Sequence, residues 1–430
     1  MSVKKQATYV FLFLFLLLCL TPSLGMLIFG SSKPAANELR TPKPAFTEED
    51  GSFNLDYFSQ LSDYLCPRLF LRQEAITLRN LLSVKLFATS PTEKVSLGRG
   101  DWLFYSETLH DDPLSERELW CAGENLRLMQ EYTESSGKRF LFVLCPNKAS
   151  VCPASLVNEN SFSDGLNLEN KLDELGVSYS SLFYTLYDRE DFFYHSDSHW
   201  NGLGAAAAAD VILAALDRPS HYGEGSFTPG EGHSGDLSAM LFPASPQVEQ
   251  DWLYPFTFRY TSHFQSPSDP TITTESDGSG SLFCYRDSFG NDLHPYLAES
   301  FATAVFSRKA DYDLMQPEAE LLLIELVERN IDYLYRYNHT YPAPERELTF
   351  DTEAAPPVEA SVSEAGTLIR ISGSLNVFDD APLYLLTGDK LYECAPKPTG
   401  FTLCLPDFNG EAKLIYQQNG LFYAAPLHIK

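Results

Sequence analysis

The feature that most constrains this chain is a set of short, largely apolar runs that alternate with helical patterns from about Val95 onward. Three of these runs cover residues 140–144, 281–285 and 321–326. Each has the length of a strand, and a strand with so few polar positions is buried on both faces. Segments 115–136 and 202–217, between these runs, have helical spacing and composition. The alternation predicts an α/β domain in which helices cover both faces of a parallel sheet.

The chain has 430 residues and a strong excess of acidic side chains. Its length allows two or three domains with substantial buried cores. Asp and Glu number 58 against 31 Lys and Arg, which gives a formal net charge of −27. Because nucleic acids carry a negative backbone, this balance argues against a nucleic-acid partner.

An apolar run from Ala7 to Phe29 follows Lys4 and Lys5. It is long enough to cross a hydrocarbon core, which takes about 20 residues. Ser23–Gly25 offers small residues suited to signal-peptide cleavage, so a cleaved signal is the alternative. Since residues 26–29 continue the run past that site, the pattern favours an uncleaved single-pass anchor. The two lysines predict that the N-terminus is inside and that the bulk of the chain is extracytoplasmic, or secreted if the signal is cleaved.

Composition divides the chain into four segments. They are a membrane anchor or signal peptide over 1–30, a stalk with N-terminal helices over 31–90, the α/β domain over 91–345, and a small all-β domain over 354–430. The last segment follows a Pro-rich hinge and is predicted to be a β-sandwich. Its strands carry many Tyr and Phe, which either stack on sugars or form the core, so it is a candidate carbohydrate-binding domain.

Three residues near predicted strand and helix ends have the chemistry of a catalytic triad. Ser288 lies between strand 281–285 and a following helix, where its Oγ projects beside backbone N–H groups that can stabilise an oxyanion. Asp197 and His199 are two residues apart on a loop, so the carboxylate can orient the imidazole that acts as base. We therefore expect an acyl-transfer site built from Ser288, His199 and Asp197.

Each of these residues also has a simpler interpretation. A serine after a strand is often only a turn or cap residue, and an Asp-x-His pair is often a surface turn. His195, Asp197 and His199 also have the spacing of a metal cluster. Because the sequence has no second dense group of ligands, we predict neither a metal nor a cofactor.

Four further residues are candidates for binding substrate or an oxyanion: Asn147, Lys148, Trp200 and Arg329. The first two follow strand 140–144, Arg329 follows strand 321–326, and Trp200 adjoins His199. Because the carboxyl ends of parallel strands meet at one edge of a sheet, these side chains are expected near Ser288. The alternatives are that Asn147 and Lys148 cap a turn and that Arg329 pairs with Glu328.

A series of motifs resembles the SGNH-hydrolase-like domain of the alginate O-acetyltransferase group, which includes the related DHHW proteins. The motifs are, in order, Gly98, Asp101–Tyr105, Pro146–Lys148, Asp197–Trp200, Gly235–Leu237, Arg286–Phe289 and Glu328–Arg329. The resemblance covers about residues 37–340. It implies a three-layer SGNH-like fold with circularly permuted motif order, in which Ser288 is the nucleophile, His199 the base and Asp197 its orienter. Arg286 departs from the glycine that hydrolases with a Gly-Asp-Ser block have at this position.

The resemblance also implies a function. The family acetylates exopolysaccharide hydroxyls with acetyl groups that a multispanning membrane O-acyltransferase passes across the membrane. We accordingly expect an extracytoplasmic O-acetyltransferase that works through an acyl-serine, with a polysaccharide acceptor and such a membrane acyltransferase as partners. The alternatives are a glycan acetylesterase of the same fold and a catalytically idle, membrane-tethered glycan-binding scaffold.

Overall fold

The computed structural model describes residues 3–34, 40–48, 50–109, 113–157, 163–316, 318–376 and 378–430. The chain forms two compact units. The first comprises Met1–Leu109, Tyr194–Ser198 and Gly230–Asp251, and the second comprises His110–Phe193, His199–Pro229 and Trp252–Lys430. The segment that holds Asp197 and His199 therefore belongs partly to each unit.

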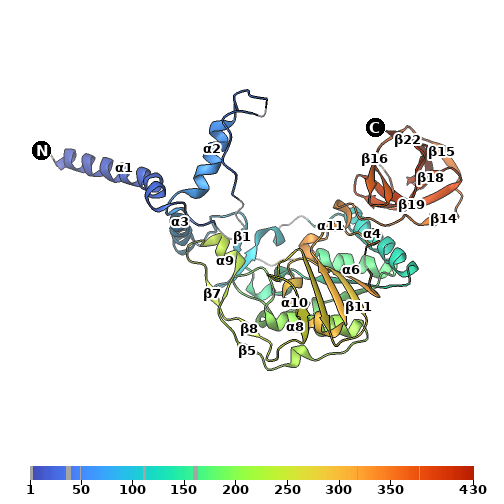
Figure 1. Ribbon diagram of the computed structural model, residues 1–430, viewed down its shortest axis with the longest axis horizontal. Coiled ribbons are helices and arrows are strands. Elements are labelled where there is room, and N and C mark those ends of the chain that lie inside the picture. The colour runs from blue at the N-terminus through green and yellow to red at the C-terminus, as the bar shows by residue number, and fades with distance from the viewer. Residues whose placement is uncertain are drawn as a thin grey trace. The chain divides into compact units, whose positions relative to one another are not determined.

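The second unit contains a seven-stranded sheet, of which β11 is labelled in Figure 1, and its strand order is β4-β3-β13-β11-β12-β10-β9. The strands are β3 Arg139–Cys145, β4 Tyr179–Ser181, β9 Tyr260–Ser262, β10 Thr271–Ser276, β11 Ser281–Tyr285, β12 Thr303–Ser307 and β13 Leu321–Val327. The five strands from β4 to β12 are parallel, β10 pairs with β12 in the antiparallel sense, and β9 pairs with β10 in the antiparallel sense. Every residue of β13 is buried, so both faces of the sheet centre are covered and the predicted α/β class is confirmed.

Two pairs of helices belong to this sheet. α4 packs against α6, and α8 packs against α10. Helix α4 begins with the predicted capping box: the Ser115 N–H donates to Glu118 Oε2 (2.9 Å), and Ser115 Oγ accepts from the Glu118 N–H (3.3 Å). The helices of the unit are α4 Glu116–Ser135, α5 Lys148–Val151, α6 Asp164–Leu175, α7 Phe183–Leu186, α8 Gly202–Ala215, α10 Gly290–Ser300 and α11 Tyr333–Arg336.

The C-terminal segment is all-β, as predicted, but it is a closed barrel and not a β-sandwich. Seven strands close because β19 pairs with β18 through residues 390–394 and with β20 through residues 395–397. A sheet that closes on itself leaves no edge strand to cover, so no second sheet is needed. The strands are β16 Val358–Ala365, β17 Leu368–Ser374, β18 Leu383–Thr387, β19 Lys390–Lys397, β20 Gly400–Leu405, β21 Lys413–Gln418 and β22 Leu421–Ile429.

The aromatic residues of the barrel pack mainly in two apolar clusters, one of which is the continuous core of the unit. Tyr384 and Tyr416 are buried, and the Phe422 ring packs 4.5 Å from the Phe350 ring. Two short strands, β14 Glu345–Arg346 and β15 Thr352–Ala354, add to the barrel sheet. These positions favour the interpretation in which the aromatic residues stabilise the barrel.

The barrel packs against α4 through polar and apolar contacts. Asn125 Nδ2 donates to the Pro396 carbonyl oxygen (2.9 Å), and Arg117 Nε donates to that of Pro398 (2.7 Å). Arg127 bonds Glu124 on its own helix and Glu393 on β19. One hydrophobic cluster includes buried residues of α4, of the sheet and of the barrel, so the second unit has a continuous core.

The first unit is built around a small apolar core of Val95, Leu103, Leu237 and Leu241. Its elements in this part are β1 Val95–Leu97, β2 Leu103–Tyr105, β6 His233–Ser234, α9 Asp236–Leu241 and β7 Val248–Glu249. The Leu103 N–H donates to the His195 carbonyl oxygen (2.8 Å), and the Ser238 N–H donates to that of Ser196 (3.0 Å). These bonds attach the 194–198 segment to β2, which pairs with β1, and to α9.

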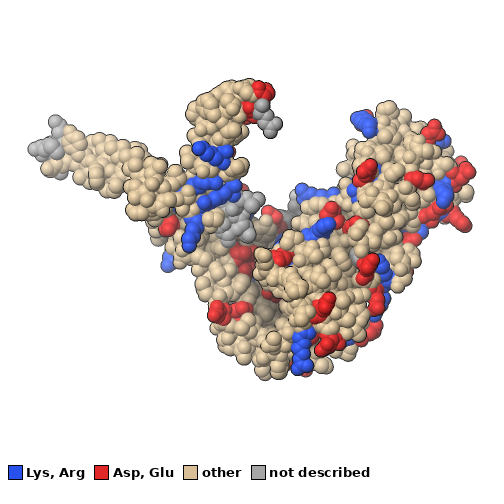
Figure 2. Space-filling model, viewed as in Figure 1, with Lys and Arg blue, Asp and Glu red and all other residues tan. Residues whose placement is uncertain are grey.

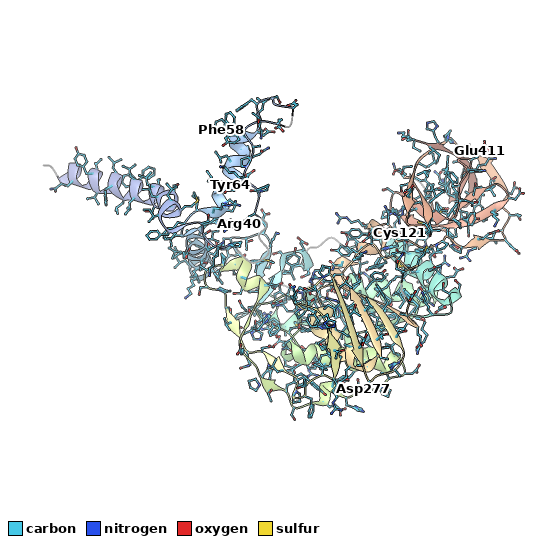
Figure 3. The ribbon with its side chains drawn as sticks, in the orientation of Figure 1. Arg40, Phe58, Tyr64, Cys121, Asp277 and Glu411 are labelled. Carbon is cyan, nitrogen blue, oxygen red and sulfur yellow. The ribbon has the colours of Figure 1, made fainter. Side chains whose placement is uncertain are left out.

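Three helices form the remainder of the described first unit: α1 Val3–Phe29, α2 Tyr57–Leu65 and α3 Arg72–Phe87. Within the part of the chain that the structure describes, one helix, over Thr8–Phe29, is long and apolar enough to cross a membrane, as an anchor or as a signal sequence. Lys and Arg side chains gather beside the end of α1, over α3 (Figure 2). Helix α2 buries none of its residues, and Phe58 projects from it (Figure 3).

Candidate active site

Ser288 lies on a turn that joins β11 to α10 and is tied to the neighbouring strands. The Arg286 N–H donates to the Ser307 carbonyl oxygen at the end of β12 (2.8 Å). On the other side, Asp287 Oδ2 accepts from the N–H of Val327, the last residue of β13 (2.8 Å). The same oxygen accepts from Nδ2 of Asn330, which follows that strand (2.9 Å). The parallel strands thus end together around the serine, as an α/β sheet requires of a site.

His199 meets Ser288 at hydrogen-bond distance. Its Nε2 lies 2.8 Å from Ser288 Oγ, although the two residues are 89 positions apart in the chain. The imidazole packs against the Phe289 ring, with 5.1 Å between centroids. Asn201, two residues after His199, is the N-cap of α8, and its Oδ1 accepts from the Leu203 N–H (2.9 Å). This bond fixes the backbone that follows His199. A base within this distance can take the proton of a serine hydroxyl.

Asp197 is buried in the first unit and accepts two hydrogen bonds on one oxygen. His233 Nε2 donates to Asp197 Oδ2 (2.8 Å), and the Asp236 N–H donates to the same oxygen (3.0 Å). His233 in turn stacks on Tyr194, with centroids 3.9 Å apart. Sequence reasoning missed His233, although it lies two residues before the Gly235–Leu237 motif.

Carboxylates hold the backbone around Asp197. Glu249 accepts from the His195 N–H (2.7 Å) and the Ser196 N–H (2.8 Å), and Asp236 Oδ1 accepts from the Ser198 N–H (2.8 Å). The His195 imidazole stacks on Trp102, with Nδ1 3.1 Å from Asp101. His195 thus lies beside the Asp101 carboxylate of its own unit, whereas the His199 imidazole lies beside the Ser288 hydroxyl.

A cleft of about 330 Å³ opens at Ser288. Its lining residues are Arg286, Asp287, Ser288, Arg308, Lys309, Ala310, Tyr312, Leu326, Arg329, Asn330 and Tyr333. Four of them are cationic and one is acidic, in a chain whose formal net charge is −27. The cleft therefore combines a serine hydroxyl at hydrogen-bond distance from an imidazole, positive charge and a partly exposed tyrosine, Tyr333.

The four other predicted binding residues fall into two groups. Arg329 lines the cleft, with its guanidinium carbon 5.3 Å from the Phe289 ring centroid. Trp200 is fully buried against that same ring, so it supports the site from below and cannot contact a substrate in this structure. Asn147 and Lys148 are also buried, and the Asn147 N–H donates to Glu328 Oε2 (2.9 Å). Neither residue lines the cleft, and their burial favours the alternative in which they have a structural role in this turn.

Glu325 is a second residue beside the candidate site that sequence reasoning missed. It is fully buried in β13, where Oε2 accepts from the Asp287 N–H (3.1 Å) and Oε1 accepts from Cys145 Sγ (3.2 Å). Burial, and then the charge of Asp287, raise the pKa of Glu325 well above its ordinary value. Gly290 leaves room for this arrangement, because a Cβ there would lie 3.0 Å from Glu325 Oε2. The sequence signal that could have revealed Glu325 was a single acidic residue within the apolar run 321–326.

Part of the chain is similar to a known protein family. Residues 95–285 match the family described as "SGNH hydrolase-like domain, acetyltransferase AlgX". The predicted family resemblance and the SGNH-like fold are thereby confirmed for this segment, which ends three residues before Ser288. No curated protein matches the chain.

Several solved structures are similar to the chain. A DHHW family protein from Eubacterium siraeum is 15% identical, with a TM-score of 0.44 over 57% of this chain and 100% of that chain. The O-acetyltransferase domain of Pseudomonas putida AlgJ is 18% identical, with a TM-score of 0.38 over 55% and 92%. Bacillus cereus PatB1 with a sulfonyl adduct is 15% identical, with a TM-score of 0.45 over 57% and 98%.

Proposed function

We propose that this chain, which carries an AlgX-type SGNH hydrolase-like domain, is a membrane-tethered extracytoplasmic O-acetyltransferase that acetylates polysaccharide hydroxyls through an acyl-serine. The observation that carries the proposal is the 2.8 Å separation of His199 Nε2 and Ser288 Oγ at the mouth of a cleft. A serine beside an imidazole is the arrangement that covalent acyl transfer needs.

The proposed reaction has two balanced steps. In the first, Ser288 Oγ attacks the carbonyl carbon of an acetyl donor while His199 takes the hydroxyl proton and passes it to the leaving group. In the second, an acceptor sugar hydroxyl gives its proton to His199 and its oxygen attacks the acetyl carbon; the bond to Ser288 Oγ breaks, and His199 returns the proton to that oxygen, which restores both residues. Helix α10 begins two residues after Ser288, and the N–H groups of a helix N-terminus favour the negative charge that develops on the carbonyl oxygen.

Asp197 is proposed to act on the reaction as a positioning residue. A carboxylate next to a catalytic imidazole selects its tautomer and stabilises the imidazolium that forms. His233 and the Asp236 N–H fix the Asp197 carboxylate, which supports a fixed orientation in the folded protein.

The charge of the cleft supports an acceptor with negative groups. Arg308, Lys309 and Arg329 stand around Ser288 in an otherwise acidic protein, and guanidinium groups bind carboxylates or phosphates in a defined geometry. Tyr333 is partly exposed at this cleft and offers a surface on which a sugar ring packs. In this proposal a multispanning membrane O-acyltransferase supplies the acetyl group, and the barrel is a candidate site for further contact with the polymer.

The test is to follow the acetyl group. The purified full chain is mixed with an activated acetyl ester and an acidic oligosaccharide, and mass spectrometry follows both the Ser288 peptide and the sugar. We expect an acetyl adduct on Ser288 and acetyl on the sugar, neither of which forms in Ser288→Ala. The control Ser300→Ala changes a serine at the far end of α10 and should behave as wild type.

Two other outcomes would contradict the proposal. Acetylated Ser288 that yields only free acetate, with every acceptor tested, would assign the chain as an esterase. A chain that forms no adduct with the ester or with a fluorophosphonate would be a glycan-binding scaffold.

A further inference from the structure

Helix α3 has the reverse of the polarity that a surface helix in water has. Its buried residues are Gln73, Thr77 and Asn80. Asn80 Nδ2 donates to the Leu241 carbonyl oxygen (2.7 Å), and Thr77 Oγ1 accepts from the Ala244 N–H (2.9 Å). The buried positions of α3 are therefore polar, and Val84 is a partly buried apolar residue that packs beside them against the core of the first unit.

The opposite side of α3 is a ridge of leucines. Leu78, Leu82 and Leu86 follow one another at a spacing of four residues and are 60%, 49% and 68% exposed. Side chains at this spacing lie on one helix face. Helix α4, in contrast, buries Leu126 and Met129 completely. A helix that turns its polar face to the protein and its leucines outward is suited to an apolar medium, since water does not favour that orientation.

The start of α3 lies beside the end of the membrane-length helix α1. The Phe70 N–H donates to the Pro22 carbonyl oxygen (3.2 Å), and the Phe70 ring packs 5.2 Å from the Phe29 ring. Gly25 makes this approach possible, because a Cβ there would overlap the Phe70 ring. Pro22 precedes the end of α1 by seven residues, which is roughly 10 Å of helix. Interfacial helices insert their apolar face about 5–10 Å below the headgroups, so Phe70 lies at a matching depth if α1 spans the bilayer.

Cationic side chains accompany the leucine ridge. The segment 66–87 contains Arg68, Arg72, Arg79 and Lys85 but only one acidic residue, Glu74. Figure 2 shows Lys and Arg gathered over α3, in a protein whose formal net charge is −27. A local excess of basic residues beside an apolar face complements the anionic headgroups of a phospholipid surface.

We infer that α3 is an interfacial helix whose Leu78–Leu86 ridge inserts into the extracytoplasmic leaflet of the bilayer that α1 crosses, with the neighbouring Arg and Lys at the level of anionic headgroups. The occupant of the ridge is thus lipid. The inference rests on the membrane tether of the proposed function but not on its chemistry. It gives the first unit a second attachment to the membrane, close to the end of α1.

The test is site-specific photocrosslinking in the full chain. Benzoylphenylalanine replaces Leu82 in one protein and Leu348 in the other, because both leucines are 49% exposed and Leu348 lies between the barrel strands β14 and β15. Each protein is placed in nanodiscs that contain phosphatidylglycerol and is irradiated. We expect roughly tenfold more lipid adduct at position 82 than at 348, because a probe among acyl chains meets C–H bonds and a probe in water meets few.

A charge variant sharpens this test. Arg79→Gln with Lys85→Gln should lower the lipid adduct at position 82 in phosphatidylglycerol discs and leave it unchanged in phosphatidylcholine discs. Lipid adduct that is equally low at positions 82 and 348 would overturn the inference. Crosslinking of position 82 to an added membrane protein, in place of lipid, would also overturn it. A chain that does not stay with the discs would refute the tether instead, whereas acetylation of Ser288 reports separately on the chemistry.

Discussion

The turn that carries Ser288 and the loop that carries Asp197 are held in different ways. The Ser288 turn is attached to the ends of β12 and β13 by bonds to the Ser307 carbonyl oxygen and the Val327 N–H. The Asp197 loop belongs to the first unit and is held by the side chains of Glu249, Asp236 and His233. Regular strands position Ser288, the proposed nucleophile, whereas irregular segments of a separate unit position the Asp197 carboxylate.

This difference predicts how the two regions respond to substitution. The backbone bond from Arg286 to the end of β12 persists when one side chain changes, so the Ser288 turn should tolerate single substitutions other than at Asp287 and Glu325, whose carboxyl groups bond to it and to β13. The Asp197 loop depends on a set of side chains, so single substitutions there should each weaken catalysis by an intermediate amount.

The largest effect is expected at the nucleophile itself. Ser288→Ala and His199→Ala should each lower kcat by a factor on the order of 10⁶, and the double variant should lose no more, because the two residues act as a unit. Stopped-flow release of the activated-ester leaving group measures this loss. A double variant whose loss equals the product of the two single losses would show that they act independently.

The next effect concerns the loop carboxylate. Asp197→Asn should lower kcat on the order of 10⁴-fold, because the amide favours the wrong imidazole tautomer. Its thermal unfolding should be compared with that of Asp217→Asn, a change at an exposed helix end. A loss below about tenfold, with an intact fold, would show that Asp197 does not orient His199.

The turn is tested through the pH dependence of stability. Above pH 4.5 the unfolded chain releases the Glu325 proton while the folded chain keeps it, because burial raises the pKa of this carboxyl. The free energy of unfolding should therefore fall with rising pH by up to about 1.4 kcal/mol per pH unit from this group. Glu325→Gln should remove this slope, as measured by urea unfolding between pH 5 and 8. The same slope in Glu325→Gln, with exposed Glu347→Gln as control, would show that Glu325 is already ionised.

The smallest effect is expected at His233. His233→Ala removes one donor to the Asp197 carboxylate, which should cost about tenfold in kcat/KM, whereas His233→Gln keeps an N–H donor and should recover most of the rate. A structural role alone would lower stability and leave the pH profile of kcat/KM unchanged. An unaltered profile in His233→Ala would therefore place His233 outside the catalytic network.

Much of the architecture could be predicted because it depends on local patterns. The apolar runs at 140–144, 281–285 and 321–326 became β3, β11 and β13, and the capping box of Ser115 began α4. These features repeat side chains at the spacing of one element, so no distant residue is needed to define them. Family motifs also placed Ser288 and His199 in the order that a shared site requires.

Other features depend on which distant segments meet. Strand β19 could close a barrel only by pairing with both β18 and β20, and Trp200 became inaccessible only when Phe289 packed over it. The raised pKa of Glu325 and the partner of His233 likewise depend on residues far away in the chain. In α3 the sequence predicted the helix from its spacing. The face of α3 that packs against the protein was decided by contacts with Leu241 and Ala244, more than 150 residues later. Local periodicity defines an element, and only tertiary contacts assign its two faces, because burial is a property of the neighbours.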